Sequence, residues 1–395
     1  MKTAIYGGSF SPPHLGHAEV VKTVSEVIRP DRFLVIPDNI PPHKELAENS
    51  PSPEARFEMC RLAFGGFPGT EISDLELRRE GKSYTSDTIS SLRSSCPEDD
   101  LFLIIGTDML SSFETWHMFE YLFEECTILV AAREDDDREE LEALKEQFAQ
   151  KYGAKIIILP HEPVEISSTQ VRALLKDRGG REYLNDAVYS YIIRNCLYDA
   201  QPDFEWLREK AYELLAPKRV LHVQGCEEEA VRLARRWGGD PEKAAVAAIL
   251  HDITKRLKPN EQLNLIRKYD IVCDDDFLTQ PKLFHAVTGA ALAKDLFGVS
   301  DEISRAIFRH TTGMPEMTLL EKIIYLADYI EPTRDFEGVE KLRKLCYEDL
   351  DRALALALEM SLEEVRSYGT EPYRFTKEAC AYYKALVNRQ ARKPE

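Results

Sequence analysis

The chain has 395 residues, 44% of which are hydrophobic, and a formal net charge of −18 at pH 7. This length predicts two or three domains, and the hydrophobic content is sufficient for packed cores. The acidic balance argues against a general nucleic-acid-binding protein, because affinity for a phosphate backbone requires clustered Lys and Arg side chains.

The first half of the sequence alternates short β-rich runs with helical stretches. The predicted strands, each bounded by turn residues, cover 3–8, 32–38, 101–108, 126–134 and 154–160. Strands that are separated by helices predict an α/β domain with a doubly wound parallel sheet.

The pattern changes near residue 200, after which we expect no further strand. Amphipathic helical patterns without a fixed repeat follow at 227–237, 242–250, 301–310, 319–330 and 349–365. We therefore predict two domains, at 1–200 and 203–390, joined by a linker at about residues 198–204. The second domain is expected to be all-α.

The first strand leads directly into the segment GGSFSPPHLGH at residues 7–17. A strand that ends at paired glycines, crosses a Pro-Pro turn and enters an amphipathic helix places backbone N–H groups at the helix N-terminus, where phosphate can bind. His14 and His17 are three residues apart, so we expect both imidazoles on one face, donating to the same polyphosphate. Paired glycines alone more often mark only a turn, and the whole segment favours the phosphate site.

This segment closely resembles the GG(S/T)F-x-P-x-H-x-G-H signature of the nucleotidylyltransferase superfamily. Members of that superfamily transfer a nucleotidyl group from a triphosphate to a phosphate or alcohol acceptor. Most of them carry Asp where this chain has Ser11, so no role for an acid at that position carries over. Both glycines and both histidines of the signature are present.

Further motifs follow in the order expected of bacterial nicotinate-nucleotide adenylyltransferase. They are IPDNIPPHK at 36–44, SYTSDT at 83–88, IGTD at 105–108 and ISSTQVR at 166–172. The resemblance covers about residues 1–200 and implies a Rossmann-like fold. It also implies the reaction of ATP with nicotinate mononucleotide to give nicotinate adenine dinucleotide and pyrophosphate, in NAD biosynthesis.

The resemblance implies a role for residues from each motif. His14 and His17 are the expected catalytic donors to the ATP phosphates, and the other expected ATP contacts are Gly7, Gly8, Ser9, Gly106, Asp108, Arg133 and a second cradle of Ser168, Thr169 and Arg172. The acceptor nucleotide is expected at Lys44, Thr85 and Trp116, which offer a charge, a hydroxyl group and a flat face for the pyridine ring. Mg²⁺ is expected to arrive with ATP, held mainly by phosphates and water.

Two of these assignments have simpler alternatives. Trp116 could equally be a core residue, and Arg133 could form a surface ion pair. Nicotinamide mononucleotide and phosphopantetheine also stay open as acceptors.

The second half carries its chemistry on histidines. Its four histidines and two of its aspartates form an H…HD…D pattern spread over helices: His222, His251, Asp252, His285, His310 and Asp328. This pattern resembles the HD superfamily of metal-dependent phosphohydrolases. A lone histidine on a helix is more often structural, but no histidine of this half is left for that interpretation.

The number of expected ligands favours two metal ions. A mononuclear HD site would be completed by four residues, His222, His251, Asp252 and Asp328. His285 and His310 are then supernumerary unless a second metal shares Asp252 as a bridge. Imidazole and carboxylate ligands without thiolate favour iron or manganese over a closed zinc site. Lys255, one helical turn from His251, is either a catalytic group that steadies the leaving phosphate or a solvated charge.

Residues 203–390 resemble, more closely than the generic signature, the HD-domain proteins that hydrolyse diadenosine tetraphosphate symmetrically to two ADP. The segments that carry this resemblance are LHDITK, FHAVTGA, HTTG and LLEKIIYLADYIEP. Spacing alone indicates only a metallophosphohydrolase, so guanosine tetraphosphate, a deoxynucleotide or a cyclic dinucleotide stay open as substrates. The alternative from another class is a regulatory module that binds nucleotide without turnover. We expect a bifunctional enzyme.

The eight cysteines are scattered without a CxxC pair, which predicts mostly buried thiols in a reducing compartment. The N-terminus runs straight into a strand without the regions of a signal peptide, and no apolar stretch is long enough to span a bilayer. We therefore expect a cytoplasmic protein whose partners are small nucleotides, not nucleic acid or membrane. A homo-oligomer stays open.

Overall fold

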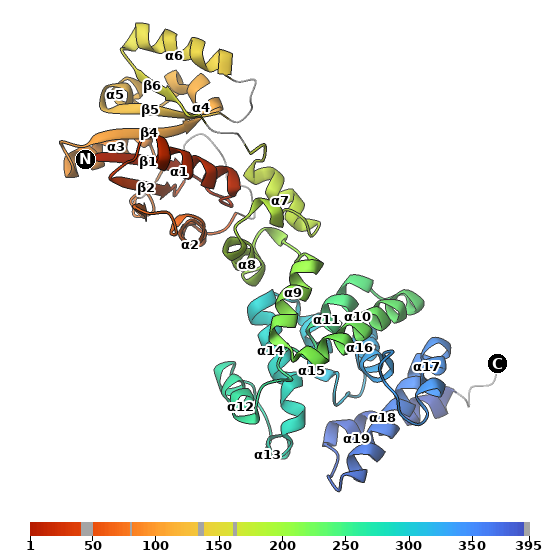
Figure 1. Ribbon diagram of the computed structural model, residues 1–395. Coiled ribbons are helices and arrows are strands. Elements are labelled where there is room, and N and C mark those ends of the chain that lie inside the picture. Colours follow the sequence, from red (N-terminus) through yellow and green to blue (C-terminus); the bar gives the residue numbers. More distant parts are fainter. Residues whose placement is uncertain (41–49, 80, 133–137, 161–163, 391–395) are drawn as a thin grey trace. The chain divides into compact units, whose positions relative to one another are not determined.

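The computed structural model describes residues 1–40, 50–79, 81–132, 138–160 and 164–390 (Figure 1). The chain divides into two compact units between Gln201 and Pro202. The first unit is α/β with a parallel sheet, and the second is built from helices. This confirms the fold class that the sequence predicts.

A six-stranded sheet forms the centre of the first unit, in the order β3-β2-β1-β4-β5-β6, and every neighbouring pair is parallel. The strands are β1 (Lys2–Gly8), β2 (Arg32–Pro37), β3 (Thr70–Ile72), β4 (Asp100–Gly106), β5 (Cys126–Ala131) and β6 (Lys155–Ile158). Only β3 was not predicted, because its three residues contain no apolar run. The strand order reverses between β1 and β4, and sheets of this kind bind ligands at the carboxyl ends of such a pair.

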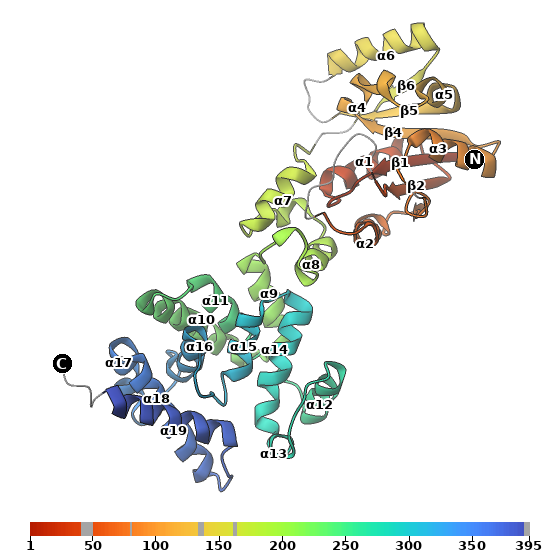
Figure 2. The same ribbon diagram turned by 180° about the vertical axis from the view of Figure 1, so that it is seen from behind.

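Helices cover both faces of this sheet (Figure 1 and Figure 2). One face carries α1 (Leu15–Val27) and α2 (Pro53–Phe64), and the other carries α3 (Thr85–Ser95), α4 (Thr107–Ser111), α5 (Phe119–Glu125) and α6 (Arg138–Tyr152). Successive residues of β1 alternate between the two cores: Ala4 packs with Val21 of α1, and Ile5 packs with Ile89 of α3. Both faces are therefore buried, as is typical of parallel sheets.

Helix α7 (Ser168–Lys176) is fixed against the segment at residues 7–17. Its capping box joins Ser167 and Gln170, and its first turn then reaches the segment. Ser168 Oγ donates to the Pro12 carbonyl at 3.0 Å, and Arg172 Nη1 donates to the Ser11 carbonyl at 2.7 Å. The unit ends with η3 (Arg181–Tyr183), α8 (Asp186–Arg194) and η4 (Leu197–Asp199).

The second unit is a helical bundle. Its helices are α9 (Phe204–Leu214), α10 (Pro217–Trp237), α11 (Pro241–Leu250), α12 (Pro259–Lys268), α13 (Asp275–Leu278), η5 (Pro281–Leu283), α14 (Phe284–Phe297), α15 (Asp301–Arg309), α16 (Leu319–Ile330), α17 (Val339–Glu348), α18 (Leu350–Ser367) and α19 (Arg374–Gln390). Helix α11 is central: residues 244–250 are all buried, and it packs against α10, α15 and α16. Its alanines allow these neighbours to approach closely.

Polar caps and glycines set where several of these helices begin and end. Asp203 Oδ1 accepts from the Trp206 N–H at 2.8 Å and caps α9, and Thr318 forms a capping box with Glu321 at the start of α16. Gly238 ends α10 with a positive φ of 72°, a conformation that favours glycine. Among the helices that the structure describes, none combines the length and the apolar character that a membrane span requires.

Candidate functional site

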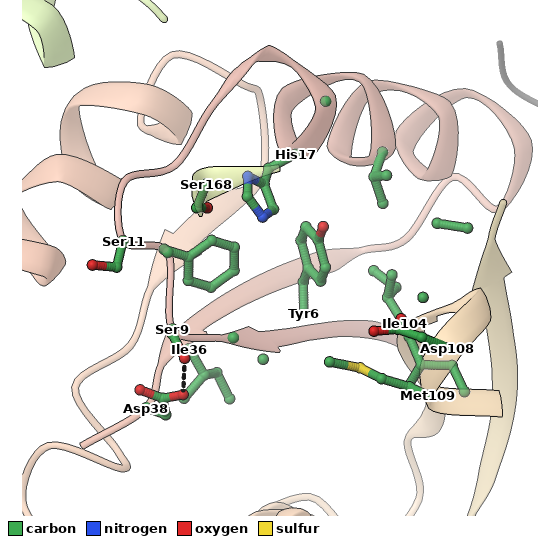
Figure 3. Close-up of a pocket in the computed structure, with 18 of the residues that line it drawn as sticks. Tyr6, Ser9, Ser11, His17, Ile36, Asp38, Ile104, Asp108, Met109 and Ser168 are labelled. Carbon is green, nitrogen blue, oxygen red and sulfur yellow. Dashed lines mark hydrogen bonds between the residues drawn. The ribbon is translucent and has the colours of Figure 1, made fainter. Parts of the chain in front are cut away.

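A cavity of about 800 Å³ opens at the carboxyl ends of β1 and β4 (Figure 3). Every residue predicted for the adenylyltransferase site that the structure describes lines this cavity: Gly7, Gly8, Ser9, His14, His17, Thr85, Gly106, Asp108, Trp116, Ser168, Thr169 and Arg172. Lys44 and Arg133, which were also predicted, lie outside the described residues. The sheet topology thus brings motifs from the whole first unit to one place.

The two histidines of the signature lie together at the start of α1. His14 is the N-cap residue, His17 is on the first turn, and their ring centroids are 3.8 Å apart. The His14 backbone N–H donates to His17 Nδ1 at 3.1 Å, so a neutral His17 carries its proton on Nε2. Figure 3 shows His17 among the residues that line the pocket, and Ser168 is also part of this lining. His17 Nε2 can therefore donate to an anion.

The glycines of the signature are needed because they lack a side chain, and not because their backbone angles are unusual. Gly7 and Gly8 are the last residues of β1, so the predicted turn begins only at Ser9. Neither has a positive φ. A Cβ at Gly8 would lie 3.3 Å from the Phe10 ring, and one at Gly16 would lie 3.1 Å from the His14 ring. Gly8 and Gly16 therefore leave room for the side chains that shape the pocket.

A fully buried arginine fixes the loop after β1. Arg56 Nη1 donates to the Ser9 carbonyl and to Asp38 Oδ1, both at 2.9 Å. Ser9 Oγ donates to Asp38 Oδ2 at 2.7 Å (Figure 3). The Ser9 hydroxyl is therefore held within the protein. Sequence reasoning missed Arg56, because nothing in its local pattern distinguishes it from a solvated arginine.

The side of the pocket expected to hold the acceptor contains both polar and aromatic groups. Thr85 is the first residue of α3, and Trp116 stacks on Phe113 with ring centroids 5.0 Å apart. Trp116 packs against the core and also lines the pocket. Glu76, which the sequence did not indicate, is buried in the same wall and accepts from Thr88 Oγ1 at 2.7 Å. Burial raises the pKa of Glu76 above its ordinary value.

In the second unit, four histidine Nε2 atoms surround Asp252, which follows α11. Asp252 Oδ2 lies 3.4 Å from His251 Nε2 and 3.9 Å from His222 Nε2. Asp252 Oδ1 lies 3.3 Å from His285 Nε2 and 3.6 Å from His310 Nε2. The two oxygens of one carboxylate thus face two different pairs of histidines. One histidine lies on α10, one directly after α11, one on α14 and one directly after α15.

Asp328, on α16, joins the first of these pairs. Its Oδ1 lies 3.0 Å from His222 Nε2 and 3.9 Å from His251 Nε2. All six residues predicted as metal ligands are therefore brought together in the structure. Two groups whose atoms could hold an ion share His251, and one of them also includes the thiol of Cys226.

The second ring nitrogen of each histidine is already engaged. The Nδ1 atoms lie within hydrogen-bond distance of four oxygens: His222 of Glu331 Oε1 at 2.9 Å, His251 of the Ala248 carbonyl at 2.6 Å, His285 of the Lys282 carbonyl at 2.8 Å and His310 of the Ile307 carbonyl at 2.6 Å. An imidazole that donates from Nδ1 has its lone pair on Nε2. That is the tautomer with which histidine binds a metal through Nε2.

Burial and charge set the protonation states in this centre. Burial opposes the ionisation of Asp252, but His251, His310 and Lys255 outweigh it and hold the pKa of the carboxyl well below its usual range. Burial lowers the pKa of His285 and of His310, and Lys255 lowers that of His285 further. The ionised Asp252 beside the neutral imidazoles of His285 and His310 is a donor set that suits a divalent cation. Burial lowers the pKa of His251, but Asp252 and Asp328 outweigh this effect and raise it, so a cation bound at His251 would displace its proton.

One further observation shows that these residues fit a metal. Asp252 Oδ1 is buried and has no hydrogen-bond partner among the described residues. A buried charged oxygen without such a partner is costly, and a cation between it and the histidines would satisfy it. His222, His251, Asp252 and Asp328 could hold one ion, and Asp252 with His285 and His310 could hold a second.

Sequence reasoning missed several groups around this centre. Arg219 Nε donates to Asp252 Oδ2 at 2.6 Å, and Arg334 Nη2 donates to Asp328 Oδ1 at 2.6 Å. Cys226 Sγ lies 3.4 Å from a nitrogen of His222, and burial raises the pKa of its thiol well above the usual value, so the thiol is neutral. Arg219 and Cys226 are three and four residues from His222 on α10. That helical spacing could have indicated them.

The predicted catalytic lysine lies at the second pair of histidines. Lys255 Nζ is 2.8 Å from His285 Nε2 and 3.8 Å from Asp252 Oδ1. Burial lowers the pKa of Lys255, and the carboxylates Asp252 and Asp328 oppose this effect. The side chain is still 41% exposed, so its ammonium group can meet a ligand from solvent.

Comparison with known proteins assigns the two units separately. A cytidylyltransferase-like family model matches residues 5–174, and an HD domain model matches residues 219–333. The HD domain implies a divalent metal. A solved structure of a predicted HD superfamily hydrolase involved in NAD metabolism, from Clostridium acetobutylicum, is 35% identical, with 47% of this chain and 100% of that chain covered and a TM-score of 0.46.

Two similar relatives match the first unit over most of their own length. A "probable nicotinate-nucleotide adenylyltransferase" of Fusobacterium nucleatum is 37% identical over 179 residues, which are 45% of this chain and 89% of the relative. One of Syntrophotalea carbinolica is 38% identical over 216 residues, which are 51% of this chain and 99% of the relative. Through its first half the chain therefore belongs to the nicotinate-nucleotide adenylyltransferase family, and its second half contains an HD domain.

Proposed function

We propose that the first unit transfers the adenylyl group of ATP to nicotinate mononucleotide, giving nicotinate adenine dinucleotide and pyrophosphate in NAD biosynthesis. The observation that carries this proposal is the placement of His14 and His17 beside the N-terminus of α7, in one cavity at the ends of β1 and β4. The cavity of about 800 Å³ has the size of a site for small organic ligands. Membership of the family supports the choice of acceptor.

The reaction needs positioned donors and no covalent intermediate. A phosphate oxygen of the acceptor attacks the α-phosphorus of ATP, the bond from that phosphorus to the bridging oxygen breaks, and pyrophosphate leaves with the bridging oxygen. His14 and His17 would donate to phosphate oxygens as charge builds up on the pyrophosphate, with Thr169 at the start of α7 near the same anion. Thr85 and Trp116 would hold the nicotinate ring. Mg²⁺ is proposed to accompany ATP.

For the second unit we propose metal-dependent hydrolysis of diadenosine tetraphosphate to two ADP. The observation that carries this proposal is Asp252, whose two oxygens face two different pairs of histidines. Two divalent ions, iron or manganese, would act when bound as Lewis acids toward a phosphoryl group and toward water. One water molecule is consumed, and the bridge between the second and third phosphates breaks. Lys255 would donate a hydrogen bond to the departing ADP.

Product identification tests both proposals. The purified full chain is incubated with ATP and, in turn, nicotinate mononucleotide, nicotinamide mononucleotide or phosphopantetheine, and the products are separated chromatographically. Nicotinate mononucleotide should be the preferred acceptor, because its carboxylate can accept from Thr85 and nearby backbone N–H groups. Equal catalytic efficiency with nicotinamide mononucleotide would contradict this choice.

The second activity is tested separately with diadenosine tetraphosphate, guanosine tetraphosphate, a deoxynucleoside triphosphate and a cyclic dinucleotide. The expected result is ADP alone from diadenosine tetraphosphate. ATP and AMP in equal amounts would show a different position of cleavage. A metal-replete chain that turns over none of the four would favour a regulatory module that only binds nucleotide.

A further inference from the structure

Two arginines, Arg219 and Arg334, contact the carboxylates of the proposed metal centre. We propose that Arg219 and Arg334 bind the phosphate chain of the substrate of the second unit. The inference rests on the proposed hydrolase function and deepens it, because it names the side chains that would recognise the phosphate chain of the substrate.

Both guanidinium groups contact these carboxylates and are partly exposed to solvent. Arg219 donates from Nε to Asp252 Oδ2 at 2.6 Å, and Nη2 contacts the same oxygen. Arg334 donates from Nη2 to Asp328 Oδ1 at 2.6 Å and from Nε to the Asp328 carbonyl at 2.8 Å. The Asp252 side chain is fully buried, whereas those of Arg219 and Arg334 are 25% and 35% exposed. Each guanidinium can therefore contact a molecule that enters from solvent.

The arginines hold the same carboxylate oxygens that face the histidines. Asp328 Oδ1 lies 3.0 Å from His222 Nε2, and Asp252 Oδ2 lies 3.4 Å from His251 Nε2. A divalent cation at these oxygens would compete with the guanidinium groups for the same lone pairs and would repel them. Their N–H groups would then be available to a second anion at the same place. The guanidinium fork matches a phosphate group, which can accept two such bonds.

The distribution of charge favours a chain of phosphates. Arg219 and Arg334 lie at the pair formed by His222 and His251, and Lys255 lies at the other pair, 2.8 Å from His285 Nε2. Cations thus stand on both sides of the bridging carboxylate. A linear polyphosphate places negative charge on both sides of the bond that breaks. A cyclic dinucleotide offers only single, separated phosphodiester charges and would use this arrangement poorly.

The experiment measures metal content and polyphosphate binding independently of turnover. The full chain is loaded with Mn²⁺, freed of excess metal and titrated with inorganic tripolyphosphate, and the electron paramagnetic resonance signal of the bound Mn²⁺ is recorded. The variants are Arg219→Gln, Arg334→Gln and the two corresponding Lys variants. Arg208→Gln is the matched control, because Arg208 makes a similar forked ion pair with Glu227, which is not a proposed ligand.

Both Gln variants should retain the wild-type number of Mn²⁺ ions and require at least about tenfold more tripolyphosphate for half of the spectral change, because each loses charge-assisted hydrogen bonds. The Lys variants keep the charge but not the forked geometry, so the tripolyphosphate concentration that they require should lie between the wild-type and Gln values. They serve as the test if a Gln variant does not fold. Arg208→Gln should match wild type. Loss of metal from the variants, or an unchanged response to tripolyphosphate, overturns the proposal.

The same data separate this inference from the proposed function. One outcome is that the wild type hydrolyses no dinucleoside polyphosphate, while tripolyphosphate still changes its Mn²⁺ signal and the arginine variants weaken this change. In that case the proposed substrate is wrong and the assignment of the arginines stands. If hydrolysis occurs and the arginine variants respond like wild type, the hydrolase function stands and the assignment of the arginines is wrong.

Discussion

The Ser11 hydroxyl lies 3.1 Å from the Tyr198 hydroxyl, in a buried contact between residues 187 positions apart in the chain. Burial raises the pKa of Tyr198, so its phenol keeps its proton and can share a hydrogen bond with the Ser11 hydroxyl. The Ser11 carbonyl also accepts from Arg172, so this residue joins the signature segment to α7 and to the end of the first unit.

This contact should be worth about 1 kcal/mol of stability, the usual net value of one buried hydrogen bond. Tyr198→Phe and Ser11→Ala should each lower the free energy of unfolding of the first unit by about that amount. The double variant should cost clearly less than the sum of the two, because both remove the same bond. Urea denaturation, with the transition of the first unit identified by the loss of adenylyl transfer, measures the three values. Full additivity would show that the two hydroxyls are not coupled.

Replacing either signature histidine should impair adenylyl transfer without unfolding the protein. His14→Ala and His17→Ala should each lower kcat/KM by at least about 100-fold, the scale for losing a donor in the transition state. Ser25→Ala, on the same helix, removes a hydroxyl that donates to the Val21 carbonyl and should leave the rate unchanged. Steady-state kinetics with ATP and nicotinate mononucleotide decide the matter. Near wild-type turnover in both histidine variants would contradict the proposal that these side chains donate to the ATP phosphates.

The sequence predicted those site residues that lie in compact motifs. His14 and His17 are one helical turn apart, and His251 and Asp252 are adjacent, so their proximity follows from local geometry alone. Arg56 and Glu331 could not be predicted in this way. Their roles depend on partners that only the tertiary fold brings close. Arg56 contacts Asp38, and Glu331 contacts His222, which lies 109 positions earlier in the chain.

The fold shows the same division between local and long-range information. The five strands that were predicted each have an apolar run, whereas β3 (Thr70–Ile72) is three residues long and owes its conformation to pairing with β2. Ser9 was expected to contact ATP, and its hydroxyl donates to Asp38, a contact that depends on the tertiary fold. Sequence patterns name candidate side chains, and the fold determines which of their atoms remain available.

The isolated protein should contain close to two transition-metal ions per chain, chiefly iron or manganese. Asp252→Ala should lose most of both ions, because it removes the carboxylate that faces both pairs of histidines. His285→Ala should weaken one site preferentially. Elemental analysis of the purified variants measures this directly. A single tightly held ion in the wild type would exclude the binuclear arrangement and leave a mononuclear HD site.

The stability of the first unit should depend on pH through Glu76. Burial raises the pKa of this carboxyl above 4.5, so its contribution to stability is fully present below pH 4.5 and is lost as the pH rises through the folded-state pKa. Glu76→Gln keeps an oxygen for Thr88 and removes the buried charge. The variant should therefore gain stability relative to wild type between pH 4 and pH 8, by about 1.4 kcal/mol per unit of pKa shift. Thermal unfolding across this range measures the difference, with the exposed Glu98→Gln as control. A difference that is constant or shrinks with pH would contradict the role of burial.

The two activities should be separable, because the residues proposed for each site lie on opposite sides of the division between Gln201 and Pro202. His17→Ala should lower adenylyl transfer by at least about 100-fold and leave diadenosine tetraphosphate hydrolysis within about twofold of wild type, and Asp252→Ala should do the reverse. Fragments 1–201 and 202–395 should each retain one activity. Both assays are run on the same preparations, with circular dichroism to show that the variants are folded.

If either substitution abolishes both activities in a folded chain, the sites depend on each other and the description as two independent enzymes fails. If the fragments are inactive while both substitutions remain selective, the sites are chemically independent but each unit needs the other to fold.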